Sequence, residues 1–394
     1  MNLDIKKGVI PSTIELPSSK SYANRALIIA AIKNSKIKIK NLPNALDVVF
    51  LIKALKEVGL SVLEDKHEVT FLNSFPECET FNKEIKTIEV GEGGTTARFL
   101  ACMLLKGSNP YILKLGSRLK ERPWVEFISM ARSMGAQCEL KNDELFIQGP
   151  IKSITSLEID CARTTQFATG MCLAFSPTMV IKPINLESSQ SYWEMTLKLI
   201  KDISQTDEYI VPIDWSSASY SLAFAALNQE TFFPYLEKDK YQADAKFYDL
   251  LSRLGFLSQD EAGVRIKPVD VKTDISMDVS DCLDLVPTLV YFLSHIDGTH
   301  TLSSVENLVH KESDRLGESI RILKAFHKGY SQGNNKLIIK GDSKIFEKSV
   351  DLIMPDDHRM VMSAALFMRH NSGGSVSPRE AVNKSYPEFF ELFN

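Results

Sequence analysis

The chain has 394 residues, of which 44% are hydrophobic and 24% are charged, and its formal net charge at pH 7 is -4. This length predicts two or three domains with an ample core, and the net acidity argues against nucleic acid or an acidic membrane surface as a general partner. Because no apolar run approaches about 18 residues and no signal peptide opens the chain, we expect a cytoplasmic protein without a membrane span.

Six times along the chain, a short polar cluster runs directly into a nearly all-apolar segment. The six apolar segments are 26–32, 99–105, 167–175, 220–227, 285–293 and 360–368. They recur roughly every 50 to 75 residues, which is typical of a repeated structural unit. A helix that is apolar all round is a buried helix, and Ser, Thr, Asp or Gly at its start leaves the positive end of the dipole available. If the six helix starts converge, they form a strong anion site.

The segments between these helices also repeat. An amphipathic helix is followed by a glycine and then by two alternating strands, as in 49–58, Gly59, 60–63 and 68–72. Gly135, Gly255 and Gly329 are the corresponding predicted helix ends, and the third copy has Lys201-Asp202 instead. Six such modules predict an α/β protein of two three-module domains. We expect one domain at 15–213 and the other at 1–14 with 214–394.

Several helix starts carry cations, although a cation there opposes the helix dipole and needs a reason. Lys20 and Arg25 lie on the first turns of the first of these helices, Lys311 and Arg315 lie in a later segment, and Arg359 opens the sixth helix. Each could be an ordinary solvated helix end on its own. Together with the acids Asp284 and Glu312 at similar starts, they favour the binding of small polyanions combined with proton transfer.

Other common functional patterns are absent from the sequence. The Gly-rich stretch 91–96 is not followed by the Lys-Ser/Thr of a phosphate-binding P-loop, and there is no dinucleotide fingerprint, zinc-protease motif or nucleophile elbow. The six cysteines are scattered without a C-x-x-C pair, so we expect buried reduced thiols.

The ordered set of motifs resembles the 5-enolpyruvylshikimate-3-phosphate synthases. The resemblance runs from about residue 9 to about residue 391 and includes SSKSYANRALI, GEGGTTARFL, LKERPW, TTQF, SSASY, KESDRL, DDHRMVM and KSYPEFF. It implies a two-domain inside-out α/β barrel, with three βαβαββ modules per domain and helix starts facing an interdomain cleft that holds the active site. It also implies transfer of the enolpyruvyl group of phosphoenolpyruvate to the 5-hydroxyl of shikimate 3-phosphate, through a tetrahedral intermediate and with release of phosphate. The resemblance implies no metal and no cofactor for this reaction. A monomer in the shikimate pathway of aromatic amino-acid biosynthesis is expected.

The resemblance also assigns roles to individual residues. Those matching phosphoenolpyruvate contacts are Lys20, Gly94, Arg122, Gln166, Arg315, Arg359 and Lys384. Those matching shikimate 3-phosphate contacts are Ser21, Arg25, Thr164, Thr165, Ser189, Tyr192, Asn307 and Lys311. Asp284 matches the carboxylate that deprotonates the 5-hydroxyl, Glu312 matches the acid that transfers a proton at the methylene, and Lys20 is placed with them as catalytic.

Two departures bear on substrate affinity. Thr164-Thr165 replace the usual Ser-Ser pair, which retains the hydroxyls and adds methyl groups. Glu92 stands where the family carries a small or neutral residue. Its carboxylate either repels phosphoenolpyruvate or pairs with a cation such as Arg98 or Lys120, and the sequence leaves both arrangements open.

Two other readings remain. One is the sister enolpyruvyl transferase that acts on UDP-N-acetylglucosamine, although its reactive loop cysteine is missing from 116–124. The other is a non-catalytic anion-binding relative, which the retention of every matched cation and both acids disfavours.

Overall fold

The computed structural model describes residues 2–80, 84–187 and 189–394. These residues form two compact units, one of residues 18–212 and one of residues 1–17 with 213–394. We call them the 18–212 unit and the 213–394 unit. In the described part of the chain, no helix has the length and apolar character needed to cross a membrane.

In the 18–212 unit, helices and strands alternate along the chain. The helices are α1 (Lys20–Ile32), α2 (Leu46–Glu57), α3 (Gly94–Leu104), α4 (Val125–Ser133), α5 (Gln166–Phe175) and α6 (Gln190–Ser204). The strands are β2 (Ile37–Lys40), β3 (Val62–Asp65), β4 (Glu68–Phe71), β5 (Lys86–Glu89), β6 (Tyr111–Lys114), β7 (Gln137–Lys141), β8 (Glu144–Gln148), β9 (Ser156–Asp160), β10 (Val180–Ile184) and β11 (Glu208–Ile210). The predicted module is clearest in the sheet β5-β6-β8-β7, where the first pair is parallel and the other pairs are antiparallel.

The 213–394 unit repeats this plan and includes short 3-10 helices, labelled η. Its helices are α7 (Trp215–Asn228), η1 (Ala243–Ala245), α8 (Lys246–Arg253), η2 (Leu283–Leu285), α9 (Val286–Ser294), η3 (Glu306–His310), α10 (Arg315–Ala325), α11 (His358–His370), η4 (Arg379–Lys384) and η5 (Pro387–Phe393). Its strands are β1 (Leu3–Ile5), β12 (Thr231–Pro234), β13 (Leu257–Asp260), β14 (Gly263–Ile266), β15 (Ser276–Asp278), β16 (Gly298–Ser303), β17 (Gly329–Gly333), β18 (Lys336–Gly341), β19 (Val350–Ile353) and β20 (Gly374–Ser377).

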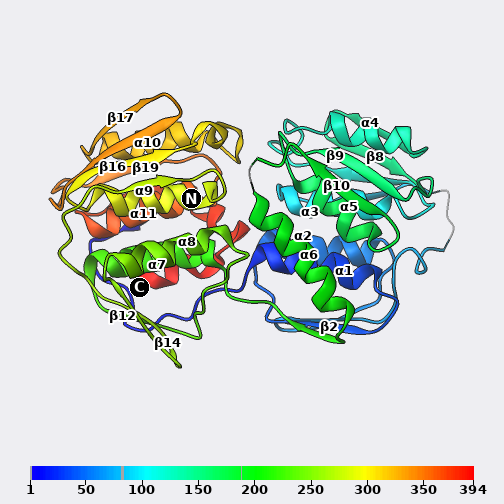
Figure 1. The fold of residues 1–394 in the computed structure, drawn as a ribbon, viewed down its shortest axis with the longest axis horizontal. Coiled ribbons are helices and arrows are strands. Elements are labelled where there is room, and N and C mark those ends of the chain that lie inside the picture. Colours follow the sequence, from blue (N-terminus) through cyan, green and yellow to red (C-terminus); the bar gives the residue numbers. More distant parts are fainter. Residues whose placement is uncertain (1, 81–83, 188) are drawn as a thin grey trace. The chain divides into compact units, whose positions relative to one another are not determined.

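The apolar helices form the centre of each unit, as their composition predicts. In the 18–212 unit, α1, α3 and α5 pack on one another, and in the 213–394 unit α7, α9 and α11 do so, with sheets around them (Figure 1). Every residue of α11 is buried, as are ten residues of α1. The α/β class is thus confirmed. The strands of the described ranges form six open sheets of two to four strands, none of which closes into a barrel.

Most module details follow the sequence pattern, with one exception. Gly59, Gly135 and Gly255 have positive φ just after α2, α4 and α8, as expected for glycines that end helices. The prediction for Gly329 is wrong, because this residue begins β17. His327, with φ of 54°, adopts the left-handed conformation after α10 instead. All six cysteines are free thiols, as predicted, and five are buried, whereas Cys78 is only half-buried.

The core of the 213–394 unit contains a buried aromatic group with two histidines. The His295 and His370 ring centroids lie 4.2 Å apart, and the Tyr291 hydroxyl is 3.1 Å from His370 Nδ1. Burial, followed by the charges of Lys328 and Lys7, lowers the pKa of His370 to about 3. Burial also lowers the pKa of His295, and the neighbouring His370 adds to the effect.

These histidines make the folded state sensitive to acid. Because the folded-state pKa of His370 lies below its value of about 6.5 in an unfolded chain, the unfolded state binds more protons between these values. The free energy of unfolding should therefore fall as the pH drops below about 6.5, by about 1.4 kcal/mol per pH unit for each histidine. Urea unfolding from pH 7 to pH 4.5 should show a shallower dependence in His370→Gln than in the wild type. Equal slopes would contradict this assignment, since the contributions of other groups cancel in the comparison.

Candidate active site

The first cluster of predicted site residues lies in the 18–212 unit, beginning at the start of α1. Ser19 caps this helix, and its hydroxyl accepts a hydrogen bond from the Tyr22 amide. Lys20 Nζ lies 2.9 Å from Asp47 Oδ2, in the first turn of α2. Asp47 is buried, and the Thr96 hydroxyl donates a hydrogen bond to the backbone carbonyl oxygen of Asp47. Asp47 thus holds a lysine whose position at a helix start is otherwise unfavourable.

Arg25 brings three of the predicted shikimate-phosphate residues together. Its Nη1 donates to the Ser21 carbonyl and its Nη2 to the Tyr192 carbonyl, while Nε donates to the Thr196 hydroxyl at 2.9 Å. Its guanidinium also lies over the Tyr192 ring. These partners are neutral, and burial lowers the pKa of Arg25 to about 10. An anion bound here would supply the missing countercharge.

Two guanidinium groups meet beside the Gly-rich turn. Arg98 is fully buried, and its Nη1 donates to Gln166 Oε1 at 2.6 Å. Burial and then the charge of Arg122 hold the pKa of Arg98 well below its usual value. A Cβ added at Gly94 would lie 2.6 Å from Arg122 Nη1 and 3.0 Å from Gln166 Oε1, so the backbone approaches both side chains closely. Such a concentration of positive charge favours a bound anion.

The predicted threonine pair lies at the start of α5. The Thr164 hydroxyl accepts a hydrogen bond from the Gln166 amide at 3.3 Å, and Thr165 is the residue before the helix. Ser189 precedes α6 with φ of 62°, close to Tyr192 on the same helix. The structure thus places the threonine pair at a helix start, as predicted, and places Ser189 at another, which the sequence did not indicate.

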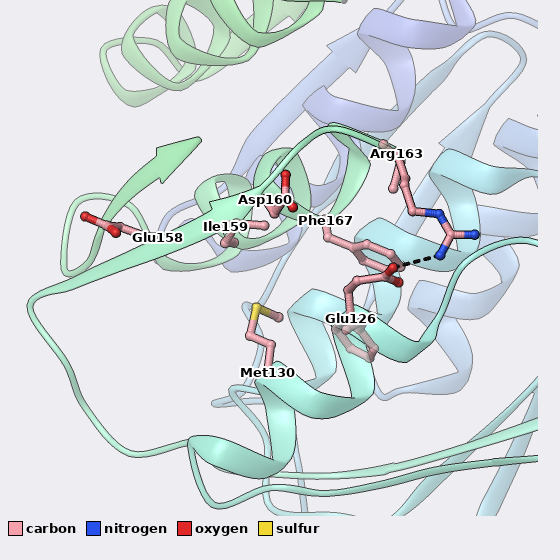
Figure 2. A pocket seen from close by; sticks show the side chains of 9 residues that line it. Glu126, Met130, Glu158, Ile159, Asp160, Arg163 and Phe167 are labelled. Atoms are coloured by element: carbon pink, nitrogen blue, oxygen red, sulfur yellow. Dashed lines mark hydrogen bonds and ion pairs between the residues drawn. The ribbon is translucent and has the colours of Figure 1, made fainter. Parts of the chain in front are cut away.

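A surface pocket lies beside Thr164 (Figure 2). Its floor is apolar, with Met130 and Phe167, while Glu158 and Asp160 supply carboxylates and Arg163 pairs with Glu126 at 2.9 Å. This pocket is unsuited to a phosphate, because its acids outnumber its one guanidinium.

The second cluster lies in the 213–394 unit around Asp284, on η2. The Asp284 carboxylate accepts from Arg315 Nη1 at 2.7 Å and from Arg359 Nη2 at 3.2 Å, and Lys311 Nζ is 3.5 Å away. Burial opposes its charge, but the positive charges of Arg359, Lys311 and Arg315 outweigh burial and hold the pKa of Asp284 well below its usual range. The side chain remains 25% exposed, so a ligand can reach it.

Asp357 binds several residues of this second cluster through its carboxylate. It caps α11, and its buried carboxylate accepts hydrogen bonds from Arg315 Nε at 2.8 Å, the Ser313 hydroxyl at 2.9 Å and the Arg359 amide at 3.0 Å. Burial alone would lower the pKa of Arg315, but Asp357 and Asp284 raise it above its usual value. Arg315 is therefore a fixed cation shared between two carboxylates.

Glu312 and Lys384 complete this group. Glu312 Oε2 lies 3.2 Å from His358 Nδ1. Lys384 Nζ donates to the carbonyl and carboxylate of Asp356. Burial lowers the pKa of Lys384, but the charges of Glu312 and Asp356 raise it above its usual value overall. The predicted residue Asn307 lies in η3, on the surface.

One set of side chains has metal-ligand geometry. Atoms of Glu312, Asp357 and His358 lie within 4.8 Å of one another. Asp357 is already bonded to Arg315, and Lys384 carries a further positive charge nearby. A divalent cation would be repelled there, so the absence of a metal stays our prediction.

Sequence reasoning did not identify the acids that position these cations. In the sequence, Asp47 and Asp357 resemble ordinary N-terminal acids of helices, and Arg98 is expected only as a partner for Glu92. Asp244, on η1, was also missed. It is buried, and burial followed by the charge of Asp284 raises its pKa to about 7. The sequence does contain one signal for such acids. Lys20 and Arg315 stand at helix starts, where a buried cation needs a negatively charged partner.

Comparison with known proteins gives a consistent family assignment. The family model EPSP synthase (3-phosphoshikimate 1-carboxyvinyltransferase) matches residues 6–205 and 201–393. Relatives named 3-phosphoshikimate 1-carboxyvinyltransferase include those of Vibrio cholerae (26% identity, covering 98% of this chain and 96% of the relative), Sulfurovum sp. (27%, 97% and 96%) and Clostridium beijerinckii (26%, 100% and 96%).

Solved structures share the fold. The EPSP synthase of Acinetobacter baumannii superposes with a TM-score of 0.78 at 19% identity, covering 99% of this chain and 97% of that one. The enolpyruvyl transferase NikO of Streptomyces tendae gives a TM-score of 0.76 at 12% identity, covering 100% and 96%. With the family model matching nearly the whole length, the chain belongs to the EPSP synthase (3-phosphoshikimate 1-carboxyvinyltransferase) family.

Proposed function

We propose that this protein transfers the enolpyruvyl group of phosphoenolpyruvate to the 5-hydroxyl of shikimate 3-phosphate and releases phosphate. The observation that carries the proposal is Asp284, a partly exposed carboxylate in contact with Arg315, Arg359 and Lys311. This arrangement combines a proton acceptor with cations that attract a polyanionic substrate.

Both units contribute to the proposed binding of the two substrates. In the 18–212 unit, Arg25 with Tyr192 suits the phosphate of shikimate 3-phosphate, because its buried guanidinium donates to neutral partners among the described residues. The Arg122 guanidinium lies beside the Gly94 backbone and Gln166, at the start of a helix, and this arrangement suits the binding of phosphoenolpyruvate. Since each unit carries part of the set, one chain supplies all the proposed residues, and we expect an active monomer.

The low pKa of Asp284 fits a base that is activated by substrate. Without ligand, three cations stabilise its charged form. When the phosphate and carboxylate groups of phosphoenolpyruvate engage Arg315 and Arg359, these cations are partly neutralised and Asp284 becomes a stronger base. Binding would thus prepare the carboxylate for proton abstraction.

The proposed reaction proceeds by addition and then elimination. In the addition, the 5-hydroxyl oxygen bonds to C2 of phosphoenolpyruvate, its proton passes to Asp284, and Glu312 donates a proton to C3. In the elimination, the bond from C2 to the phosphate oxygen breaks, a C3 proton returns to Glu312, and phosphate leaves with the proton held by Asp284. His358, 3.2 Å from Glu312, is placed to orient this acid.

A phosphate-release assay tests the function. Phosphoenolpyruvate is supplied with either shikimate 3-phosphate or UDP-N-acetylglucosamine. Release with shikimate 3-phosphate alone supports the proposal, whereas release with the sugar nucleotide alone would indicate the sister transferase. No release with either would favour the non-catalytic anion-binding relative.

Glu312→Gln should separate proton transfer at C3 from binding. Both substrates should bind with affinity near that of the wild type, because the amide retains the size of the side chain. Exchange of solvent deuterium into the phosphoenolpyruvate methylene should slow by about 10²-fold or more, the usual contribution of a general acid–base group. Mass spectrometry of recovered phosphoenolpyruvate measures this exchange. Exchange at the wild-type rate would show that Glu312 does not carry this proton.

A further inference from the structure

Glu92 is half-buried and lies in the Gly-rich turn that precedes α3, and its carboxylate pairs with neutral groups rather than with Arg98 or Lys120, the cations expected from the sequence. It accepts hydrogen bonds from the Ser117 hydroxyl at 3.2 Å and from the amides of Arg118 and Leu119, each at 3.3 Å. The carboxylate is therefore paired with neutral donors of one distant loop, 25 to 27 residues further along the chain.

The same loop leads to Arg122, and we call residues 117–122 the Arg122 loop. Residues 117–121 form consecutive turns, in which the Lys120 amide donates to the Gly116 carbonyl and the Arg122 amide donates to the Leu119 carbonyl. A carboxylate that accepts from the first amides of a turn acts like a helix N-cap, here supplied by another segment. The Trp124 indole also donates to the Leu119 carbonyl, so the capped turn connects directly to the buried residue that precedes α4.

The two segments are also joined through their backbones. The Gly116 amide donates to the Gly91 carbonyl at 3.1 Å. A Cβ added at Gly116 would lie 2.3 Å from the Glu92 carboxyl carbon, so glycine is required there to admit the carboxylate. At the far end, Arg122 Nη1 would lie 2.6 Å from a Cβ at Gly94. The Gly-rich turn and the Arg122 loop thus meet twice, at Glu92 and at Gly94.

We infer that Glu92 is a positioning residue, whose carboxylate holds the Arg122 loop against the Gly-rich turn and so sets the place of the Arg122 guanidinium. The inference rests on the proposed function for its effect on phosphoenolpyruvate. It reverses the expectation that the charge of Glu92 weakens binding, because the carboxylate organises a cationic contact.

Steady-state kinetics should show this as a change in KM. Glu92→Ala should raise the KM for phosphoenolpyruvate about fivefold to tenfold, the equivalent of losing one capping side chain. The kcat and the KM for shikimate 3-phosphate should stay within about twofold, since binding rather than chemistry is disturbed. Glu92→Gln, which retains one carbonyl acceptor, should give a smaller increase. Glu89→Gln removes an exposed carboxylate paired with Lys114 in the same unit and should change none of these constants.

A double-mutant cycle with Gly116→Ala adds specificity. Alone, this substitution should displace the Glu92 carboxylate and raise the same KM, whereas in the Glu92→Ala background it should add little. Additive effects, or a KM that stays constant or falls in Glu92→Ala, would overturn the inference.

Hydrogen–deuterium exchange tests the hold of Glu92 on the Arg122 loop, which we call the clamp, separately from the proposed function. Without any substrate, the peptide covering 117–122 should exchange faster in Glu92→Ala and as in the wild type in Glu89→Gln. Unchanged exchange would overturn the clamp regardless of activity. Faster exchange in a protein whose wild type releases no phosphate would uphold the clamp and reject the proposed function.

Discussion

Asp284→Asn is expected to lower kcat by about 10²–10⁴-fold while phosphoenolpyruvate still binds. The amide preserves the size of the side chain and can still accept a hydrogen bond from Arg315, but it cannot take the proton of the 5-hydroxyl. The variant also removes a carboxylate that competes with the substrate for Arg315 and Arg359. The KM for phosphoenolpyruvate should therefore stay constant or fall, which separates this variant from one that merely disrupts the site.

Asp281→Asn is the matched control, because it removes the same charge three residues earlier from a side chain that we place outside the site. Its kcat should match the wild type. The free energy of unfolding of both variants should be measured with the kinetics, so that a folding defect is recognised. A kcat in Asp284→Asn within about tenfold of the wild type would exclude Asp284 as the essential base.

The fold was predictable where local chemistry and burial agree. Ser19, Asp214 and Asp357 each cap a helix whose remaining residues are almost entirely buried, so the polar cluster and the apolar run carried the same information. The glycines after α2, α4 and α8 were predictable for the same local reason. The fourth strand of the sheet β11-β2-β4-β3 could not be predicted in this way. Strand β11 pairs parallel with β2, from the other end of the unit, and no local pattern specifies such a partner.

The cations of the candidate site could be predicted from the sequence, but the acids with which they pair could not. The sequence indicates that Lys20 and Arg315 need countercharges, yet their partners Asp47 and Asp357 lie 27 and 42 residues away. An acid at a helix start satisfies the local dipole whether or not a distant guanidinium reaches it, so the sequence pattern is the same in both cases. Glu92 illustrates the same limit, since its partners are backbone amides that carry no side-chain signal.

Asp357→Ala is expected to lower the free energy of unfolding of the 213–394 unit by about 3–5 kcal/mol, because it leaves Arg315 buried with one of its two carboxylates removed. The cap of α11 and the acceptor for Ser313 are lost with it. Asp356→Ala, one residue earlier, removes an exposed carboxylate paired with Lys384 and should cost about 1 kcal/mol or less.

The destabilisation should come from the buried Arg315 guanidinium, which keeps Asp284 but loses Asp357, and a second substitution tests this cause. Arg315→Met removes the buried charge, so Asp357→Ala should cost much less in that background than in the wild type. Urea unfolding can be followed by tryptophan fluorescence after replacing Trp124 and Trp193 by phenylalanine, which leaves Trp215 as a reporter within the 213–394 unit. If Asp357→Ala costs the same with and without Arg315, the loss of the helix cap and not the broken ion pair would explain the effect.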